Sequence, residues 1–395
     1  MLTLEEALRR LLARAQVTGD EEVPLAAASG RVLAEPRVIA PVDVPPFANS
    51  AMDGFALRAT DTPGTLRIVG EVAAGSAGLI EVSGGTAVRI MTGAPLPPGA
   101  DTVVPLEEAG ESEAKVTVPL TAPETYVRAA GSDTPAGTEV CLPGVLGPAA
   151  VAVLASLGCD PVRVRRRPRV ALLSTGDELV DPGLSLRRGQ IYDSNTAALT
   201  AAITEAGGEP QRMGRVPDTR EAVENALRAG AGSHLIVTSG GVSVGQHDHV
   251  RGVLEGSGSL DFWRIAVQPG KPLAVGEIAG VTVIGLPGNP VSALVTFELF
   301  VRPMIRAMLG LSGDGRLHLQ ARPQELIRKD RERRAFLRVY VWREAAETLA
   351  RSTGGQGSAQ LRPLAEANAL LVVPEGEEAA DPARTYEAII LGELS

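Results

Sequence analysis

Small and polar residues are concentrated in three short segments, 174–178, 239–245 and 286–290. The second segment, Ser-Gly-Gly-Val-Ser-Val-Gly, is rich in glycine and precedes an expected helix. Glycines allow backbone N–H groups to approach a phosphate, and the N-terminus of a helix attracts anions. The segment matches neither the P-loop pattern nor Gly-x-Gly-x-x-Gly, so a phosphate site and a simple strand–helix turn both stay open.

Carboxylates gather on or near the same segments, at Asp177, Glu178, Asp193, Asp218 and Asp248. Carboxylate oxygens at the rim of a phosphate site are the ligands that Mg²⁺ prefers. Asp193 and Asp218 precede expected helices, so N-capping is the favoured interpretation for these two. Glu178 and Asp248 have no such structural task, and we expect them to be functional, as magnesium ligands.

Lysine is rare in this chain, which holds three, and one of them lies in the sequence Gln-Pro-Gly-Lys-Pro at 268–272. A lysine in so rigid a frame favours contact with a bound anion, although an exposed loop lysine is the alternative. His247 and His249 point apart on a helix, which argues against a zinc or iron site. Cys141 and Cys159 fit no metal or redox spacing and are expected to be buried free thiols.

Strand and helix patterns alternate from residue 169 onward. Apolar runs that begin near residues 169, 234 and 281 predict buried strands, and each leads into one of the three polar segments. Alternating strands and helices predict a parallel sheet with right-handed crossovers, in which ligands bind at the carboxyl ends of the strands. The three segments should therefore converge at one edge of one sheet.

Helical spacing and end signals predict the other elements. Helices are expected at 3–16, 148–158, 194–208, 219–230, 247–256 and 291–309. Thr3 and Ser194 are the expected caps of the first and third of these helices. Proline-rich residues 36–56 should be extended, and short alternating runs over 57–140 and 313–395 predict two β-domains.

The composition excludes several classes of protein. The chain has 395 residues, 44% hydrophobic and 22% charged, which is typical of a globular protein of two or three domains. A net charge of −9 argues against nonspecific nucleic-acid binding, which needs a basic surface. No run approaches the roughly 20 apolar residues of a membrane span, and the N-terminus does not look like a signal peptide. We therefore expect a cytoplasmic protein that binds neither nucleic acid nor membrane.

Seven motifs, taken together and in this order, resemble the molybdopterin molybdenumtransferases, the family of MoeA and the gephyrin E domain. They are PPFANSAMDGFA (45–56), VRIMTGAPLPPGADTVVPLEE (88–108), STGDEL (174–179), DSN (193–195), TSGGVSVGQHD (238–248), QPGKPL (268–273) and GLPGNPVSA (285–293). The resemblance covers essentially the whole chain.

The resemblance implies a multidomain α+β fold. Its parts would be a helical and extended linker domain (1–44 with 139–167), an inserted β-domain (45–138), a MogA-like α/β molybdopterin-binding domain with a parallel sheet (168–312) and a C-terminal β-barrel-like domain (313–395). It also implies a homodimer whose two subunits build the active cleft, with transient contacts to the molybdopterin adenylyltransferase and to molybdoenzymes or cofactor-maturation proteins.

The reaction implied by the resemblance is insertion of molybdenum from molybdate into adenylylated molybdopterin, with Mg²⁺-dependent hydrolysis and release of AMP. The substrate brings its own sulfur ligands, so the protein needs no cysteine cluster. The resemblance assigns catalytic roles, in cofactor binding or turnover, to Asp53, Thr92, Glu178, Asp218 and Asp248. Cofactor-binding positions are Ser174, Gly176, Asp177, Ser194, Asn195, Ser239, Gly240, Gly241, Ser243, Pro287, Asn289 and Pro290. Molybdate contacts would be Lys271, Ser292, Arg333 and Ser358.

The chain departs from the family pattern at two places. Gln268 stands where many members have lysine, which lowers the positive charge there. Residues 331–338 lack the usual Gly-Arg opening, so the arginine match falls on Arg333 or on Arg334. Two other functions are alternatives: adenylylation of molybdopterin by the α/β domain alone, which the additional β-domains argue against, and a scaffold role, which no basic patch or added linker supports.

Overall fold

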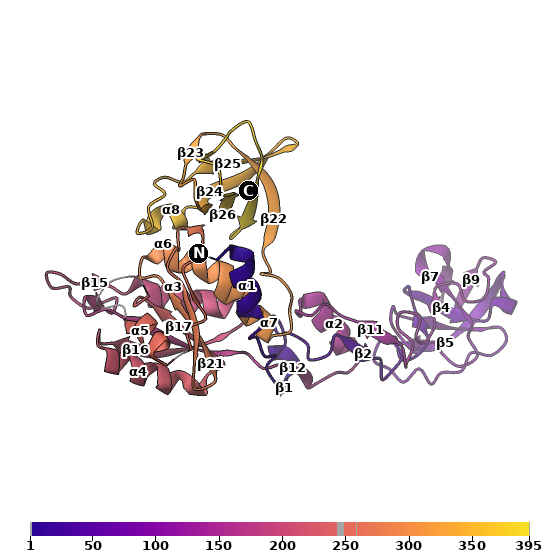
Figure 1. Ribbon diagram of the computed structural model, residues 1–395. Coiled ribbons are helices and arrows are strands. Elements are labelled where there is room, and N and C mark those ends of the chain that lie inside the picture. Colours follow the sequence, from indigo (N-terminus) through magenta and orange to yellow (C-terminus); the bar gives the residue numbers. More distant parts are fainter. Residues whose placement is uncertain (1, 243–248, 258, 395) are drawn as a thin grey trace. The chain divides into compact units, whose positions relative to one another are not determined.

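The computed structural model describes residues 2–242, 249–257 and 259–394 (Figure 1). Their contacts divide the chain into two compact units. One unit combines the residues up to Asp20 with those from Arg165 onward, and the other is Glu21–Val164. The predicted four-domain boundaries stay a prediction. No described helix is long and apolar enough to cross a membrane.

The larger unit contains the α/β domain, built on a six-stranded sheet. In spatial order its strands are β16 (Glu209–Val216), β13 (Arg169–Thr175), β17 (Leu235–Ser239), β21 (Val281–Leu286), β20 (Ala274–Ile278) and β18 (Phe262–Trp263). The first four are parallel, as the alternating pattern predicts, whereas β20 and β18 add an antiparallel edge. The chain order reverses between β13 and β17, which is where ligands bind in such sheets.

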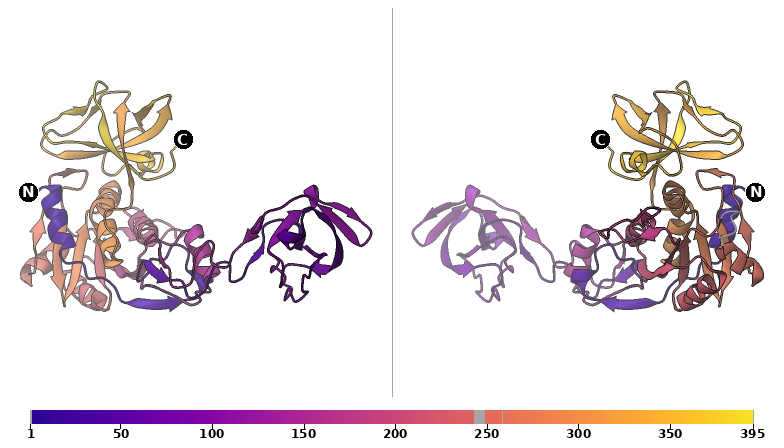
Figure 2. Two further views of the ribbon diagram at one scale, coloured as in Figure 1. Left: turned by 90° about the vertical axis from the view of Figure 1, so that its right-hand side faces the viewer. Right: turned by 90° about the vertical axis from the view of Figure 1, so that its left-hand side faces the viewer.

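Helices cover both faces of this sheet (Figures 1 and 2). Helices α4 (Arg220–Ala229) and α5 (His249–Gly256) bury one face in a core cluster that includes Val223, Leu227 and Val253. Helix α3 (Ser194–Glu205) packs against α6 (Pro290–Thr296) and α7 (Arg302–Met308). A π-helical turn, Phe297–Val301, interrupts the long helix expected at 291–309.

The expected capping role of Asp193 is confirmed, whereas the expected caps Ser194 and Asp218 are wrong. The carboxylate of Asp193, not Ser194, caps α3 by accepting a hydrogen bond of 2.9 Å from the backbone N–H of Thr196. The hydroxyl of Thr219, not Asp218, caps α4. In both cases several oxygen-bearing side chains are adjacent, and only the backbone geometry decides which one reaches the N–H at the third position.

A short arm leaves the α/β domain after β13. Strands β14 (Leu179–Val180) and β15 (Ile191–Tyr192) pair in parallel at its base. Helix α1 (Leu4–Leu12), capped by Thr3 as predicted but shorter than expected, packs against α7 (Figure 2).

The remainder of the larger unit is a barrel. Its strands are β24 (Arg334–Glu344), β25 (Glu347–Ser352), β22 (Leu317–Pro323), β28 (Tyr386–Ile390) and β26 (Ala369–Val373), and pairing of β26 with β24 closes the sheet. Strand β19 (Val267–Gln268) of the preceding region pairs with β24. The short strands β23 (Ile327–Arg328) and β27 (Ala379–Ala380) and helix α8 (Leu361–Ala365) lie between the barrel strands in sequence. The expected barrel-like domain is thus confirmed.

Buried ion pairs join the barrel to the α/β domain. Glu298, on the π-helical turn, accepts hydrogen bonds from Arg302 (2.7 Å) and Arg316 (2.9 Å). All three side chains are at most 12% exposed, and Glu205 pairs with both arginines. Next to them, His318 contacts Glu387 at 2.5 Å and Asp314 at 2.9 Å.

The smaller unit contains the inserted β-domain. Its six-stranded sheet has the order β7 (Thr102–Pro105), β4 (Gly54–Leu57), β6 (Thr86–Ile90), β5 (Gly64–Val72), β9 (Lys115–Val118) and β8 (Gly110–Ser112). The smaller unit also contains helix α2 (Pro148–Ser156) and two two-stranded ribbons. One ribbon pairs β2 (Arg37–Ile39) with β11 (Glu139–Cys141), and the other pairs β3 (Asn49–Ser50) with β10 (Val127–Arg128). Strands β1 (Asp20–Val23) and β12 (Val162–Arg165) pair where the units meet in sequence.

The expectation of two buried thiols is wrong for Cys141. Both cysteines are free, but Cys141 is exposed and Cys159 is partly buried. Cys141 ends β11 in a two-stranded ribbon, and its strand partner there is the exposed Arg37.

Candidate active site

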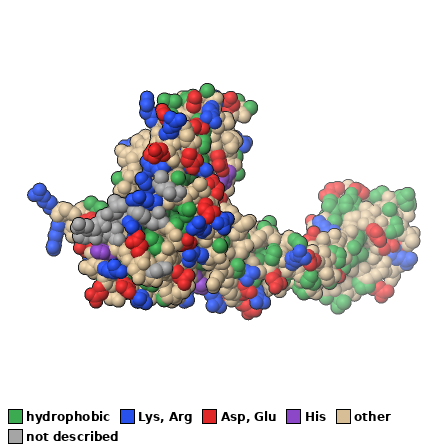
Figure 3. Space-filling view, viewed as in Figure 1, with side chains coloured by type: hydrophobic (Ala, Val, Ile, Leu, Met, Phe, Trp, Pro, Cys, Tyr) green, Lys and Arg blue, Asp and Glu red, His purple; other side chains and the backbone are tan. Residues whose placement is uncertain are grey.

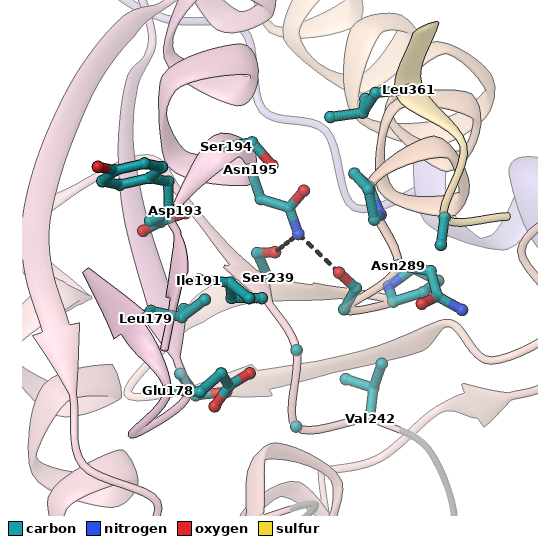
Figure 4. A pocket seen from close by; sticks show the side chains of 18 of the residues that line it. Glu178, Leu179, Ile191, Asp193, Ser194, Asn195, Ser239, Val242, Asn289 and Leu361 are labelled. Atoms are coloured by element: carbon teal, nitrogen blue, oxygen red, sulfur yellow. Dashed lines mark hydrogen bonds between the residues drawn. The ribbon is translucent and has the colours of Figure 1, made fainter. Parts of the chain in front are cut away.

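A cavity of about 680 Å³ lies at the carboxyl ends of β13, β17 and β21 (Figure 4). All three polar segments contribute to it, as the sheet topology predicts. The predicted site residues that line it are Glu178, Ser194, Asn195, Ser239, Gly240, Gly241, Pro287, Asn289 and Pro290. The lining also includes Leu179, Ile191, Tyr192 and Asp193 from the arm, and Ala359 and Leu361 from the barrel.

Asn195 holds two of the segments together. Its side-chain amide donates hydrogen bonds to the hydroxyl of Ser239 (2.7 Å) and to the backbone carbonyl of Gly288 (2.8 Å). Figure 4 shows Asn289 and Leu361 across Asn195 and Ser239 from Asp193. The amide therefore fixes the distance between the ends of β17 and β21 and leaves a gap lined by polar groups on both sides.

The glycine-rich segment needs its glycines. Gly240 and Gly241 have φ of +94° and +72°, a conformation that side chains rarely adopt. A Cβ on Gly240 would lie 2.9 Å from the hydroxyl oxygen of Thr175, and one on Gly241 2.8 Å from a methyl of Val250. The backbone of this turn is thus exposed toward the cavity without side chains, as an approach to a phosphate requires.

Two buried hydroxyls below the cavity lack partners among the described residues. They are those of Ser174 on β13 and Thr238 on β17. Ser174 was predicted to bind the cofactor, but it is 3% exposed and is not among the described residues that line the cavity. We therefore place Ser174 beneath the site rather than in it.

Glu178 brings the carboxylate of the first segment to the cavity. Its backbone is fixed to the arm, because the N–H of Ile191 donates to the carbonyl of Glu178 at 2.9 Å. Gly176, with φ of +146°, lets this carboxylate fold over it, since a Cβ there would lie 2.8 Å from a carboxylate oxygen. Asp177 is exposed and, with Gly176, is not among the described lining residues.

The other predicted carboxylates that the structure describes do not form a metal cluster. Asp218 precedes α4 and does not line the cavity, while Asp193 lines it but is engaged as a helix cap. Within the part of the chain that the structure describes, no three His, Cys, Asp or Glu side chains could hold a metal together. Asp248 and Ser243 lie outside the described residues, so their predicted roles stay predictions.

The barrel reaches the cavity through Ala359, which follows Ser358, although Ser358 and Ser292 themselves are not among the described lining residues. The side-chain amide of Asn289 donates to the hydroxyl of Ser358 at 3.0 Å, and the N–H of Val291 donates to its carbonyl at 3.1 Å. Ser292, the neighbouring molybdate candidate, is 4% exposed on the first turn of α6. Two of the predicted molybdate residues therefore lie on elements that touch each other.

Arg338 was missed by the sequence analysis. It lies in the middle of β24 and is fully buried, and its guanidinium donates to the carbonyls of Gly355 (2.9 Å) and Gly357 (3.1 Å). Its Nε has no hydrogen-bond partner among the described residues, and burial lowers its pKa to about 10. Arg338 therefore stabilises the loop that carries Ser358 through these hydrogen bonds. No described carboxylate balances its positive charge.

The two arginines that the sequence pointed to are already paired. Arg333 forms an ion pair with Asp330 at 2.6 Å, and Arg334 contacts Glu5 and Glu375. Gln268 also contacts Asp330, because its side-chain oxygen accepts a hydrogen bond of 2.9 Å from the backbone N–H of Asp330. These pairs fix the start of β24, and neither Arg333 nor Arg334 is among the described residues that line the cavity, which is also true of Arg338.

Lys271 is exposed, in the loop that follows β19. Its neighbour Pro272 lines the cavity, whereas Lys271 itself is not among the described lining residues. The long side chain nevertheless starts one residue from the cavity wall.

Asp53 and Thr92 meet in the smaller unit. The backbone N–H and the hydroxyl of Thr92 both donate to one carboxylate oxygen of Asp53, at 2.6 and 2.8 Å. Pairing of β4 with β6 brings these residues together, because Gly54 lies opposite Ile90. Both side chains are exposed, and the hydrogen bonds from Thr92 lower the pKa of Asp53. The resulting pair is a fixed, charged carboxylate on an open surface.

Comparison with known proteins gives three matching sequence families. They are the MoeA N-terminal region (domain I and II) over residues 2–158, a probable molybdopterin binding domain over 171–307, and the MoeA C-terminal region (domain IV) over 320–390. Two similar proteins are molybdopterin molybdenumtransferase 2 of Mycobacterium tuberculosis, 39% identical over 89% of this chain and 90% of that one, and molybdopterin molybdenumtransferase of Haemophilus influenzae, 38% identical over 95% of both.

Solved structures agree. The molybdopterin biosynthesis MoeA protein from Pyrococcus horikosii matches all of both chains with a TM-score of 0.84 and 34% identity. A second MoeA structure, from Pyrococcus horikoshii OT3, has a TM-score of 0.82 at 29% identity and covers 99% of this chain and 100% of its own. The chain therefore belongs to the molybdopterin molybdenumtransferase family and is an enzyme of that family.

Proposed function

We propose that this enzyme transfers molybdenum from molybdate to adenylylated molybdopterin, with Mg²⁺-dependent cleavage of the phosphoanhydride and release of AMP. The observation that carries the proposal is the cavity at the carboxyl ends of β13, β17 and β21, which the barrel closes through Ala359 and Leu361. Its volume of about 680 Å³ is in the range of cofactor sites, and its polar groups come from separate loops that point at one space.

The phosphates would bind at the turn of Gly240 and Gly241. The N–H of Gly240 already donates to the carbonyl of Leu286 at 3.0 Å, so the N–H of Gly241 would be the backbone donor, with the hydroxyl of Ser239 fixed beside it by Asn195. Such donors hold anions without the cost of reorienting side chains. Proline at 287 and 290 would keep the facing loop rigid.

Mg²⁺ fits this arrangement only with help from the substrate. Glu178 is the one described cavity carboxylate that is not used as a helix cap. Mg²⁺ is commonly held by one or two carboxylates together with phosphates and water, so Glu178 and the substrate phosphates would hold it. The ion would supply charge neutralisation at the phosphoanhydride that is cleaved.

For molybdate, we propose Ser358, Ser292 and Lys271 as predicted, with Arg338 in place of Arg333. A tetrahedral oxyanion needs cationic and hydroxyl donors. The charge of Arg333 is balanced by Asp330. The charge of Arg338 has no carboxylate partner among the described residues, and its guanidinium donates a hydrogen bond to the loop that carries Ser358. An anion near this loop would balance a buried cation that is otherwise costly.

We include Asp53 and Thr92 in the proposed reaction because they lie in the motifs at 45–56 and 88–108 that match the family. Their two hydrogen bonds keep the carboxylate charged and oriented, which suits a role in turnover rather than in folding. We further propose that the enzyme is a homodimer whose two subunits together build the active cleft, and that it meets the adenylyltransferase and recipient proteins only transiently.

The proposed function is tested by supplying adenylylated molybdopterin, Mg²⁺ and molybdate, and measuring AMP over time. The proposal predicts AMP release that increases with molybdate and the appearance of molybdenum bound to the pterin. Incorporation of AMP from ATP into molybdopterin would instead support adenylylation. If neither reaction occurs, the proposed transfer is wrong, and a scaffold role is left.

A further inference from the structure

The arm that follows β13 places apolar side chains in solvent beside the cavity. Between β14 and β15 it carries Leu184 and Leu186, and β15 itself consists of Ile191 and Tyr192. These four side chains are 58%, 43%, 55% and 44% exposed. The loop between the two strands holds Arg187 and Arg188, both exposed, and basic side chains project from the region of β15 in Figure 3. Exposed large apolar side chains that are grouped in this way mark a contact surface.

The base of the arm is firmly held. Leu179 pairs with Ile191 and Val180 with Tyr192, and the N–H of Asp193 donates to the carbonyl of Val180 at 2.9 Å. The next residues begin α3, whose cap is Asp193. Tyr192 therefore stands on a defined backbone between a strand pair and a helix N-terminus.

The ring of Tyr192 is also held from its far end. Its hydroxyl donates a 2.9 Å hydrogen bond to the carbonyl of Leu184, on the same arm. With the backbone and the hydroxyl both fixed, the ring has little freedom to rotate, yet 44% of the side chain stays exposed. The polar end of the side chain is satisfied, and what is left open is aromatic surface.

Among the described residues that line the cavity, Tyr192 is the aromatic one. Aromatic residues make up only 3% of the chain, so an exposed ring at this place is unusual for this sequence. The proposed substrate contains two flat heteroaromatic groups, adenine and the pterin. Aromatic side chains stack on such rings, and truncation of a stacking side chain weakens binding of nucleic-acid bases about ten- to hundred-fold.

We infer that Tyr192 is a binding residue of the enzyme, and that its ring, fixed by the hydrogen bond to Leu184, stacks on a flat heterocycle of the substrate at the mouth of the cavity. This inference rests on the proposed function. It assigns Tyr192 to affinity and not to the reacting atoms, so loss of the ring should raise KM and leave kcat nearly unchanged.

The test compares Tyr192→Ala, Tyr192→Leu and Tyr192→Phe with the wild-type enzyme by calorimetric titration of AMP and, separately, of molybdopterin without AMP. The alanine and leucine variants should lose about ten- to hundred-fold in affinity for one of the two probes, because both lack an aromatic face. Phe keeps the ring and should lose at most a few-fold. Loss for AMP identifies adenine as the stacked ring, and loss for molybdopterin identifies the pterin.

Leu186→Ala is the matched control, since Leu186 is a similarly exposed apolar residue of the same arm that does not line the cavity. It should leave both affinities unchanged. Wild-type affinity for both probes in Tyr192→Ala and Tyr192→Leu would overturn the inference while the proposed function stands. If the wild-type enzyme binds neither probe, the proposed function fails first and the inference fails with it.

Discussion

The side-chain amide of Asn289 donates a 3.0 Å hydrogen bond to the hydroxyl of Ser358. Asn289 follows β21 of the α/β domain, and Ser358 lies in a loop of the barrel 69 residues later. Together with the hydrogen bond from Val291 to the carbonyl of Ser358, it makes one wall of the cavity depend on both regions. Substrate affinity should therefore respond to this contact between domains.

Replacing Asn289 or Ser358 by Ala should raise KM for adenylylated molybdopterin about five-fold each, since one hydrogen bond contributes about 1 kcal/mol. The double variant should lose little more than either single one, because both changes remove the same bond. AMP release at varied substrate measures this. Ser156→Ala, at an exposed helix end, is the control. Fully additive losses would show that the two residues act separately.

Arg338→Gln should weaken the molybdate dependence of AMP release by at least ten-fold, because a charge-assisted hydrogen bond contributes about 1.5–3 kcal/mol. Arg333→Gln should change the molybdate dependence less than three-fold. The reason is that Asp330 already neutralises Arg333. Thermal unfolding of both variants checks that Arg338→Gln still folds, and Arg338→Lys provides a charged variant that keeps the buried cation. An equal effect of the two glutamine variants would contradict the assignment.

Asp53→Asn should abolish turnover with no change in melting temperature, because the Asp53 side chain is exposed and bonds only Thr92 among the described residues. Thr92→Val should reduce turnover by removing one of the two bonds, and Thr92→Ser should retain it. Full activity of Asp53→Asn would remove this carboxylate from the reaction.

The same variant tests the homodimer. Co-expressed Asp53→Asn and Glu178→Gln subunits, each inactive alone, should regain about a quarter of the wild-type activity if one cleft draws on both subunits, since half of random dimers then contain one intact site. Isolated heterodimers without activity would rule out the shared cleft.

Glu298→Gln should destabilise the protein by about 1–3 kcal/mol, because it removes the more buried of the two carboxylates, Glu298 and Glu205, that pair with Arg302 and Arg316. Glu224→Gln is the matched control: it breaks an exposed pair with Arg228 at the same four-residue spacing and should cost less than about 0.5 kcal/mol. Calorimetric unfolding compares the two. Equal effects would mean that burial of the Glu298 cluster adds nothing.

His318 should make stability depend on pH. Burial lowers its pKa, but hydrogen bonds to Glu387 and Asp314 more than offset this, so the net pKa is raised above 6.5. Protonated His318 therefore stabilises the folded state fully below pH 6.5, and this contribution is lost as pH rises through the raised pKa. The melting temperature of wild type relative to His318→Gln should be highest at and below pH 6.5 and should decrease as the pH rises above that value. A difference in melting temperature that does not change with pH would contradict this role of His318.

The sequence predicts the cavity well because its residues follow from local patterns. An apolar run that ends in glycines or in Pro-Gly-Asn-Pro marks a strand and the loop after it, and parallel strands place such loops at one edge. Ser239 and Asn289 lie in loops predicted in this way and line the cavity, as does Asn195, which the family resemblance implied.

What the sequence could not show depends on contacts between distant segments. Arg338 interrupts the apolar run Ala-Phe-Leu-Arg-Val-Tyr-Val, which is a signal, but only the loop at 353–358 folding over it makes the arginine buried. The ion pair of Arg333 with Asp330 is likewise a contact that the motif match does not predict. The exposure of Tyr192 beside the cavity is likewise a property of the folded chain that residue spacing does not predict.

The central claim is that molybdate and the adenylylated pterin meet in the cavity shared by the α/β domain and the barrel. Anomalous X-ray scattering from crystals soaked with AMP and molybdate tests this claim most directly, because the anomalous signal of molybdenum gives its position in the crystal. The account predicts a molybdenum peak within hydrogen-bonding reach of Ser358 and near Arg338, with AMP between Ser239 and Asn289. A molybdenum peak at a distant surface, or AMP bound away from these loops, would contradict it.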